Sequence, residues 1–227
     1  MSKKLFITGT GTDIGKTFVT GLMIKKLNEK GKKSAYYKAA MSGNRRAKDG
    51  SLIPDDAIYV KTISGIVQPL SEMCPYVYET AVSPHLASRI EGNPVRMSII
   101  RQGFEVLCQK YDYITMEGSG GIFCPLSFDE EKLQLGDVIR ELKFNCLLIA
   151  DAGLGTINAV MLTVEYMRSN NIPVKGIIFN RFRPGDILHE DNLKMCETMT
   201  GLKVLTCVKD GDTELDISFD LLESLYE

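Results

Sequence analysis

The 227-residue sequence has no tryptophan, only two histidines, and six cysteines that are scattered without a C-x-x-C pair. This cysteine pattern offers neither zinc-ligand spacing nor a disulfide framework, so it predicts a reduced, cytoplasmic protein. No apolar stretch approaches the roughly 18 residues of a membrane span. The apolar run near the amino terminus ends within a few residues at Gly9 and is too short for a signal peptide. We therefore expect no membrane partner.

An excess of positive charge is also missing. The chain carries 27 Lys and Arg against 29 Asp and Glu, a net charge of −2, and has no basic run. A nucleic-acid backbone calls for a basic patch, so we expect no nucleic-acid partner. Apolar content is ample, because 44% hydrophobic residues can bury a core without disulfides. This length predicts a single domain covering 1–227.

Strand-like and helix-like patterns alternate along the whole chain. Apolar runs without polar alternation, such as CLLIAD and VKGIIFN, are typical of a parallel sheet covered on both faces. We therefore expect an α/β fold with a mostly parallel central sheet and helices on both faces. The expected strands are 4–8, 34–38, 113–117, 146–151, 174–180 and 203–208, and the expected helices are 16–29, 99–109, 135–142, 158–168, 188–199 and 219–226. Residues 42–94, rich in Gly, Pro, Ser and charges, are expected to form a long, irregular, functional region.

A phosphate-binding loop is predicted by the stretch FITGTGTDIGKT, residues 6–17, which joins a strand to a helix. Successive backbone N–H groups and the positive end of the helix would bind anionic oxygens. Lys16 adds a charge for the β- and γ-phosphates, and Thr17 offers a hydroxyl to Mg²⁺. The loop is one residue longer than usual, because Thr10 stands where a glycine is expected and Gly9 precedes it. The chain is therefore expected to be a P-loop NTPase-like domain.

Two other interpretations of this loop are weaker. A chance glycine-rich turn does not account for the strand before it and the helix after it. A dinucleotide fingerprint has a different glycine spacing, and the second strand ends in Lys38, where a ribose-binding acid would be expected. A nucleoside triphosphate with Mg²⁺ fits best.

Carboxylates for the metal are expected at strand ends near this loop. The strand before EGSGG ends in Glu117, and the second acid is expected to be Asp55 or Asp56, either of which could instead be a helix N-cap. Lys38 ends a neighbouring strand. In most sheets such a lysine is a solvated edge residue, but beside a triphosphate it can stabilise a transferring phosphoryl group.

Taken together, these motifs resemble the dethiobiotin synthetases, ligases of the biotin pathway, along most of the chain. The matching pieces are FITGTGTDIGKT (6–17), YYKAAMSG (36–43), DDA (55–57), SPH (83–85), EGSGG (117–121) followed by PL (125–126), and GLGTINA (153–159), with an apolar strand ending in Asn180. In that family the longer phosphate loop is the normal form.

The resemblance implies an ATP- and Mg²⁺-dependent cyclo-ligase that joins CO₂ to 7,8-diaminopelargonate and closes a ureido ring, giving dethiobiotin, ADP and phosphate. It implies Mg²⁺ at Thr17, Asp56 and Glu117, and catalytic roles for Lys38 and Lys16. The implied nucleotide contacts are Asp13, Ile14, Gly15, Lys16, Thr17, Phe18, Asp56, Glu117, Gly118, Ser119, Gly120 and Asn180. The implied substrate contacts are Ser42, Gly155, Thr156 and Asn158. It also implies a homodimer in which the helix starting near Gly155 serves the partner's active site.

One departure from the family pattern, the role of one histidine and two rival functions remain open. Many relatives have a proline against the adenine where this chain has Val208 and Lys209, which leaves selectivity for ATP over other triphosphates open. His85 is either structural or near the substrate. A regulatory or partitioning ATPase is the main rival, although such proteins usually carry a lysine near Thr10. An amide ligase of the cobyrinic acid type would need a glutaminase domain that this chain lacks.

Overall fold

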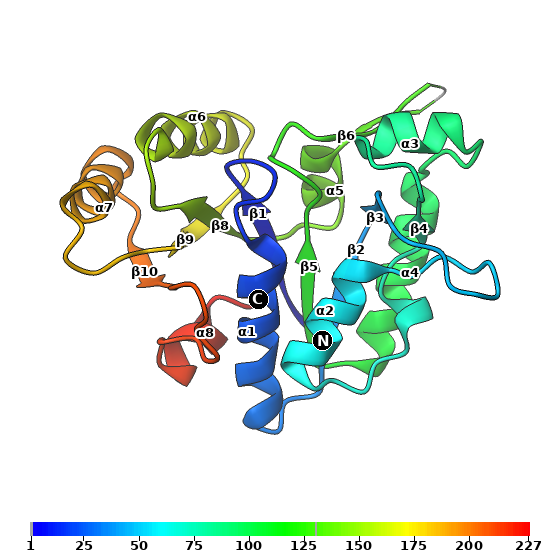
Figure 1. Cartoon of the computed structure of the whole chain (residues 1–227), viewed down its shortest axis with the longest axis horizontal. Helices are drawn as coiled ribbons and strands as arrows, with labels where there is room; N and C mark the ends of the chain where they lie inside the picture. The colour runs from blue at the N-terminus through cyan, green and yellow to red at the C-terminus, as the bar shows by residue number, and fades with distance from the viewer. Residues whose placement is uncertain (1, 130) are drawn as a thin grey trace.

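A six-stranded parallel sheet in the order β10-β9-β8-β1-β5-β2 forms the centre of the computed structural model, which describes residues 2–129 and 131–227 (Figure 1). The strands are β1 (Lys3–Gly9), β2 (Ser34–Lys38), β3 (Ala40–Met41), β4 (Tyr76–Val77), β5 (Tyr113–Glu117), β6 (Pro125–Phe128), β7 (Lys132–Gln134), β8 (Cys146–Asp151), β9 (Val174–Asn180) and β10 (Val204–Cys207). The helices are α1 (Lys16–Glu29), α2 (Asp55–Ser64), the short 3₁₀ turn η1 (Leu70–Glu72), α3 (Pro84–Ile90), α4 (Met97–Lys110), α5 (Leu135–Glu141), α6 (Thr156–Ser169), α7 (Ile187–Thr200) and α8 (Phe219–Ser224).

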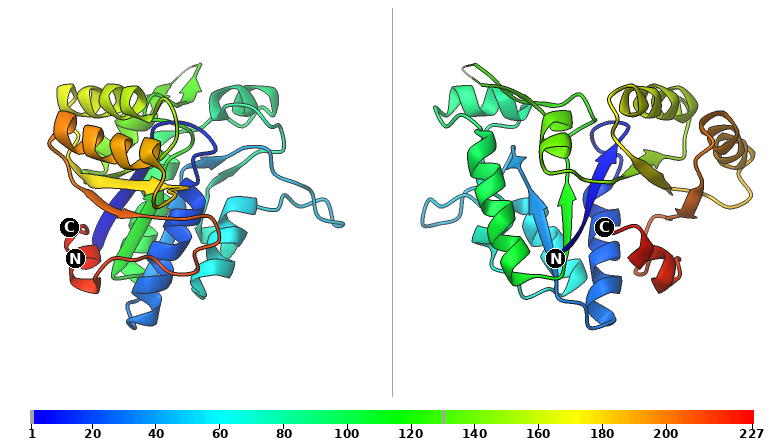
Figure 2. Two further views of the ribbon diagram at one scale, coloured as in Figure 1. Left: turned by 60° about the vertical axis from the view of Figure 1, so that its left-hand side comes forward. Right: turned by 180° about the vertical axis from the view of Figure 1, so that it is seen from behind.

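Helices cover both faces of this sheet (Figures 1 and 2). On one face, Leu5 and Ile7 of β1 pack with apolar residues of α1 and α8, and α2 lies against α1. On the other face, Phe6 of β1 packs with α4 and α5, and Leu148 of β8 packs with α6 and α7. Because side chains alternate along a strand, neighbouring residues of β1 serve opposite cores. This arrangement confirms the predicted doubly covered α/β sheet.

The carboxyl ends of the central strands meet at one edge of the sheet, because all six strands are parallel. In the ladder between β2 and β5, Lys38 lies opposite Glu117. In the ladder between β1 and β5, Ile7 lies opposite Glu117, and the phosphate loop follows β1 directly. Ligand sites of open α/β sheets lie at this edge. The residues predicted from the strand ends are therefore brought together by the register.

The prediction of an irregular region at 42–94 is wrong, because this region contains α2, η1, the short strand β4 and α3. Ala57 and Val60, one turn apart on α2, are fully buried beside Ile24 of α1. Gly21 lets the two helices approach closely, since a Cβ added there would lie 3.1 Å from a methyl carbon of Ile63. The frequent Gly and Pro residues do interrupt regular structure in this region, but the segments between them are long enough for helices of ten residues (α2) and seven residues (α3).

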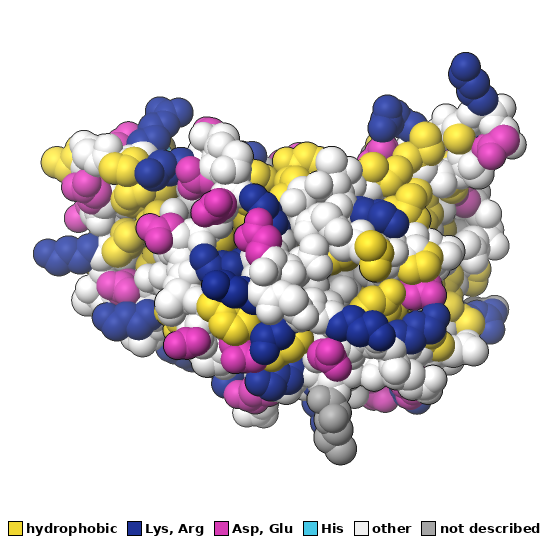
Figure 3. Space-filling model, turned by 90° about the horizontal axis from the view of Figure 1, so that it is seen from below, with side chains coloured by type: hydrophobic (Ala, Val, Ile, Leu, Met, Phe, Trp, Pro, Cys, Tyr) yellow, Lys and Arg dark blue, Asp and Glu magenta, His cyan; other side chains and the backbone are white. Residues whose placement is uncertain are grey.

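The surface carries charges of both signs. Lys and Arg side chains are interspersed with Asp and Glu over the face in Figure 3. Across residues 2–129 and 131–227, no helix combines the length and the apolar character that a bilayer crossing demands.

Candidate active site

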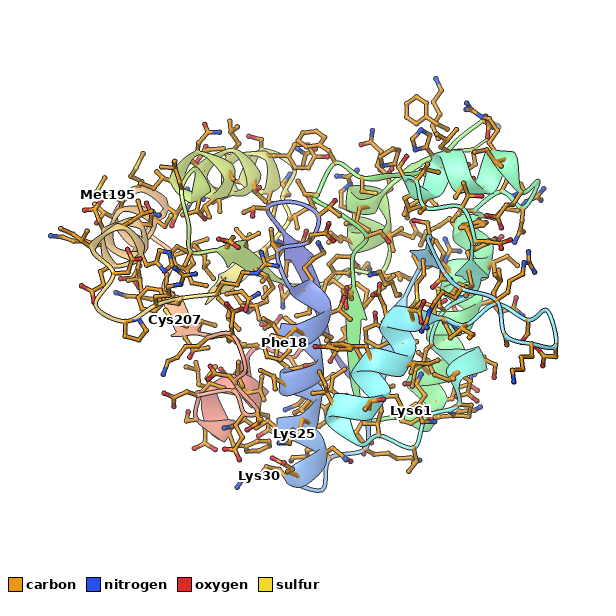
Figure 4. All side chains as sticks on the ribbon, viewed as in Figure 1. Phe18, Lys25, Lys30, Lys61, Met195 and Cys207 are labelled. Atoms are coloured by element: carbon orange, nitrogen blue, oxygen red, sulfur yellow. The ribbon has the colours of Figure 1, made fainter. Side chains whose placement is uncertain are left out.

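A cavity of about 600 Å³ opens at the carboxyl edge of the sheet, between the phosphate loop, the end of β2 and the start of α2. Most residues that the sequence analysis singled out line this cavity. They are Asp13, Gly15, Lys16, Thr17, Phe18, Lys38, Ser42, Asp55, Asp56, Glu117, Ser119 and Gly120. Phe18 lies in the first turn of α1 (Figure 4).

The phosphate loop is held in shape by Asn180 at the end of β9. The Asn180 Nδ2 donates a hydrogen bond of 2.9 Å to the carbonyl of Ile14. Gly15 then adopts a left-handed conformation with φ of 87°, and a Cβ added to it would lie only 1.9 Å from that Nδ2. Only glycine fits at this position. Among the described side chains, none caps the start of α1, so its first N–H groups face the cavity available to an anion.

Lys16 folds back over this loop. Its Nζ donates a hydrogen bond of 2.6 Å to the carbonyl of Gly11. Burial, followed by the nearby charge of Lys38, lowers the pKa of Lys16 to about 8, and the acids Glu117 and Asp56 offset only part of this shift. A group of this kind gains stabilisation from an arriving phosphate, which restores a counter-charge beside the ammonium.

Lys38 joins the two acids of the site. Its Nζ lies 2.6 Å from Asp56 Oδ2 and 2.8 Å from Glu117 Oε1, and Thr17 Oγ1 donates to the same Glu117 oxygen at 2.8 Å. Burial by itself lowers the pKa of Lys38, but the charges of Glu117 and Asp56 and their hydrogen bonds outweigh it and raise that pKa. Lys38 therefore stays protonated although it is buried, and it differs from a solvated strand-edge lysine in being held by two acids.

Side chains from three elements thus meet at this point: Asp56 and Glu117 contact Lys38, and Thr17 contacts Glu117. Thr17 lies in the first turn of α1, Asp56 lies in the first turn of α2, and Glu117 ends β5. Carboxylate and hydroxyl oxygens are the donors that Mg²⁺ prefers, so this set fits a hard divalent cation. The described residues contain no cluster of three His, Cys, Asp or Glu side chains suited to a metal.

The structure separates Asp55 from Asp56. Asp55 forms an exposed pair with Arg45 at 2.6 Å, whereas Asp56 faces Lys38. The residue before them, Pro54, occupies the N-cap position of α2, so neither acid is the N-cap. Both acids line the cavity, but consecutive positions on a helix point about 100° apart, and only Asp56 contacts Lys38.

Several predicted residues lie outside the cavity lining. Ile14 is buried in the core between the sheet and α1. Gly118 sits against Leu135, since a Cβ added to it would lie 2.6 Å from a leucine methyl group. Asn180 lies behind Gly15, and its buried Oδ1 has no hydrogen-bond partner among the described residues.

The predicted substrate residues Gly155, Thr156 and Asn158 also lie outside this cavity, at the start of α6. Gly155 precedes the helix in a left-handed conformation with φ of 90°. The substrate roles of all three residues remain predictions, as does the role of His85, which lies in the first turn of α3 with its Nδ1 2.9 Å from the hydroxyl of Ser83. Val208, at the position expected to hold proline, is buried, and its N–H donates to the carbonyl of Phe179.

Sequence reasoning missed two residues of this site. Tyr36 donates from its hydroxyl to Glu117 Oε2 at 3.1 Å, and burial followed by the charge of Glu117 raises its pKa, so it stays a donor. Arg181 lines the cavity and links Asp151 Oδ2, at 2.8 Å, to the carbonyl of Asp13, at 2.6 Å. Strand alternation could have found Tyr36, two residues from Lys38 on the same face; no sequence signal points to Arg181.

Fold and site together define a P-loop nucleotide-binding α/β protein. Solved structures with this fold include the MinC:MinD cell division complex of Aquifex aeolicus, with a TM-score of 0.59 and 13% identity over 98% of this chain and 86% of that chain. FtsY from Elizabethkingia anophelis has a TM-score of 0.59 and 12% identity over 100% of this chain and 64% of that one.

Closer relatives define the family. A family model described as an AAA domain matches residues 3–213. The chain is 48% identical to the ATP-dependent dethiobiotin synthetase BioD of Brachyspira hyodysenteriae, covering 100% of both chains. It is 45% identical to the protein of the same name from Clostridium perfringens strain 13, covering 100% of this chain and 99% of that one. The chain belongs to the dethiobiotin synthetase family.

Proposed function

We propose that this chain uses ATP to close 7,8-diaminopelargonate and CO₂ into dethiobiotin, releasing ADP and phosphate. The observation that carries the proposal is Lys38, held at the cavity between two acids and beside a phosphate loop, in a chain 48% identical over its whole length to a named dethiobiotin synthetase. We also propose that residues 1–227 work as one domain. A cytoplasmic location stays a prediction.

The chemistry needs positioned charges and no covalent enzyme intermediate. One substrate amine adds to CO₂ and gives a carbamate, whose oxygen attacks the γ-phosphorus while ADP leaves. The second amine then attacks the carbamoyl carbon of the mixed anhydride, and phosphate leaves as the ring closes. Lys16 and Lys38 line the cavity in which these oxygens gather charge, so both are the proposed catalytic groups.

Thr17, Asp56 and Glu117 are the proposed Mg²⁺ ligands. When bound, the metal would neutralise charge on the β- and γ-phosphate oxygens. The support is that Asp56 and Glu117 both contact the Lys38 ammonium, while Thr17 Oγ1 lies 2.8 Å from the same Glu117 oxygen, so all three side chains meet beside a positive charge. Ser42 at the cavity wall is the proposed contact for the reacting end of the substrate.

A matched pair of variants tests the metal assignment. Asp56→Asn removes an acid that faces the cavity, so we expect the Mg²⁺ concentration for half-maximal turnover to rise about tenfold or more. Asp55→Asn makes the same change one residue earlier, where the acid pairs with exposed Arg45, and we expect little effect. Turnover is measured across a Mg²⁺ titration. Equal curves for the two variants would contradict the assignment.

We propose a homodimer in which the start of α6 binds the substrate's distal carboxylate for the partner. The surface at α6 supports this, because Leu154 and Leu162 are 91% and 64% exposed, and Phe123, whose ring contacts that of Tyr166 at a tilted angle, is 60% exposed. Apolar surface of this kind often marks an interface. The oligomeric state can be measured by sedimentation.

The assay that tests the function is dethiobiotin formation by the purified protein. We expect ADP release only when diaminopelargonate and bicarbonate are both present. Parallel reactions with ATP, CTP and GTP measure the selectivity that Val208 leaves open. Hydrolysis that is independent of both substrates, without dethiobiotin, would instead favour a switch ATPase.

A further inference from the structure

The two oxygens of Glu117 have different partners. Oε1 lies at the cavity, where it accepts hydrogen bonds from Thr17 and Lys38, each at 2.8 Å. Oε2 lies behind it and accepts a hydrogen bond from the hydroxyl of Tyr36 at 3.1 Å. Glu117 is only 1% exposed, so solvent does not compete for either oxygen. A carboxylate with one oxygen anchored in this way presents the other in a fixed direction.

The backbone of Tyr36 is held in place by a glutamine side chain at the edge of the sheet. β2 is the outermost strand, so the backbone groups of Tyr36 on its open side have no neighbouring strand. The side chain of Gln68 takes that place: its Oε1 accepts from the Tyr36 N–H at 2.8 Å, and its Nε2 donates to the Tyr36 carbonyl at 3.0 Å. Gln68 is fully buried, and the tyrosine ring packs among Ile24, Val60 and Met73.

We propose that Tyr36, anchored by Gln68, is a positioning residue that holds Glu117 in the orientation required to bind the nucleotide's divalent cation. This inference rests on the proposed role of Glu117 as a Mg²⁺ ligand. Second hydrogen bonds to a ligating carboxylate commonly change metal affinity by tenfold or more, because they orient the ligand. In this protein the second hydrogen bond comes from the Tyr36 hydroxyl, and Tyr36 does not line the cavity.

The test measures how tightly the protein binds a nucleotide, and it does not depend on catalytic turnover. The affinity for β,γ-imido-ATP is determined by calorimetry with Mg²⁺ and again with EDTA. Tyr36→Phe keeps the ring and removes only the hydroxyl. We expect the gain in affinity produced by Mg²⁺ to shrink about tenfold in this variant, while affinity in EDTA changes little.

Tyr37→Phe is the matched control. Tyr37 is equally buried, lies next in the same strand on the opposite face, and loses a hydrogen bond of 2.9 Å to the carbonyl of Ile100. Both variants lose one buried hydrogen bond, so both should melt at a lower temperature. Only Tyr36→Phe is expected to show a smaller gain in nucleotide affinity when Mg²⁺ is added.

Equal Mg²⁺ responses in the two variants would overturn the inference and show that the hydroxyl has a purely structural role. That result would leave the proposed function intact, since dethiobiotin formation by the unaltered protein is measured separately. Conversely, an unaltered protein that binds Mg²⁺ and nucleotide but makes no dethiobiotin would refute the proposed function. The comparison of nucleotide binding by Tyr36→Phe and Tyr37→Phe would still decide the role of Tyr36.

Discussion

Replacing Lys38 with alanine should lower turnover by about 10²–10³-fold or more, because one preorganised charge at the reacting phosphoryl group is lost. The structure adds a second consequence. Glu117 would keep its charge in a buried position without its main partner, and breaking a buried pair costs about 3–5 kcal/mol of unfolding free energy. The variant should therefore melt at a clearly lower temperature than the unaltered protein.

Added Mg²⁺ and ADP should recover part of that stability, because another cation then faces the same oxygens. Melting curves with and without Mg²⁺ and ADP measure this recovery. Lys38→Met is the companion variant, since it keeps most of the side-chain volume and loses only the charge. Near-normal dethiobiotin formation by either variant would remove Lys38 from the catalytic groups.

Gly15→Ala should nearly abolish nucleotide binding. The new Cβ would meet Asn180 Nδ2 at 1.9 Å, and the backbone φ of 87° is unfavourable for alanine. The clash can be relieved only by moving the loop or breaking the hydrogen bond from Asn180 to Ile14, and either change disorders the N–H groups that face the phosphates. We expect ADP affinity to fall at least about 100-fold.

Gly11→Ala is the control in the same loop. No atom lies within 4 Å of a Cβ added there, and its φ is not in the left-handed region. ADP titrations of the two variants should therefore differ widely. A Gly11 variant as damaged as the Gly15 variant would mean that the loop needs glycine flexibility throughout and that Asn180 has no special role.

Local chemistry explains what sequence reasoning predicted well. Four strands, at 34–38, 113–117, 146–151 and 174–180, begin and end at the predicted residues, because buried apolar runs have sharp polar or glycine boundaries. The phosphate loop was identified because its function depends on consecutive residues. The region 42–94 was misjudged because α2 is stabilised by packing against α1, which its own composition does not reveal.

The sequence by itself determined the parallel sheet, the phosphate loop and the strand-end positions of Lys38 and Glu117, since each follows from neighbouring residues. Only the tertiary structure decided which of Asp55 and Asp56 contacts Lys38, that Lys38 joins two acids, and that Tyr36 stands behind Glu117. These facts depend on strand register and on the rotation of α2 about its axis. Both are set by contacts between segments far apart in the chain.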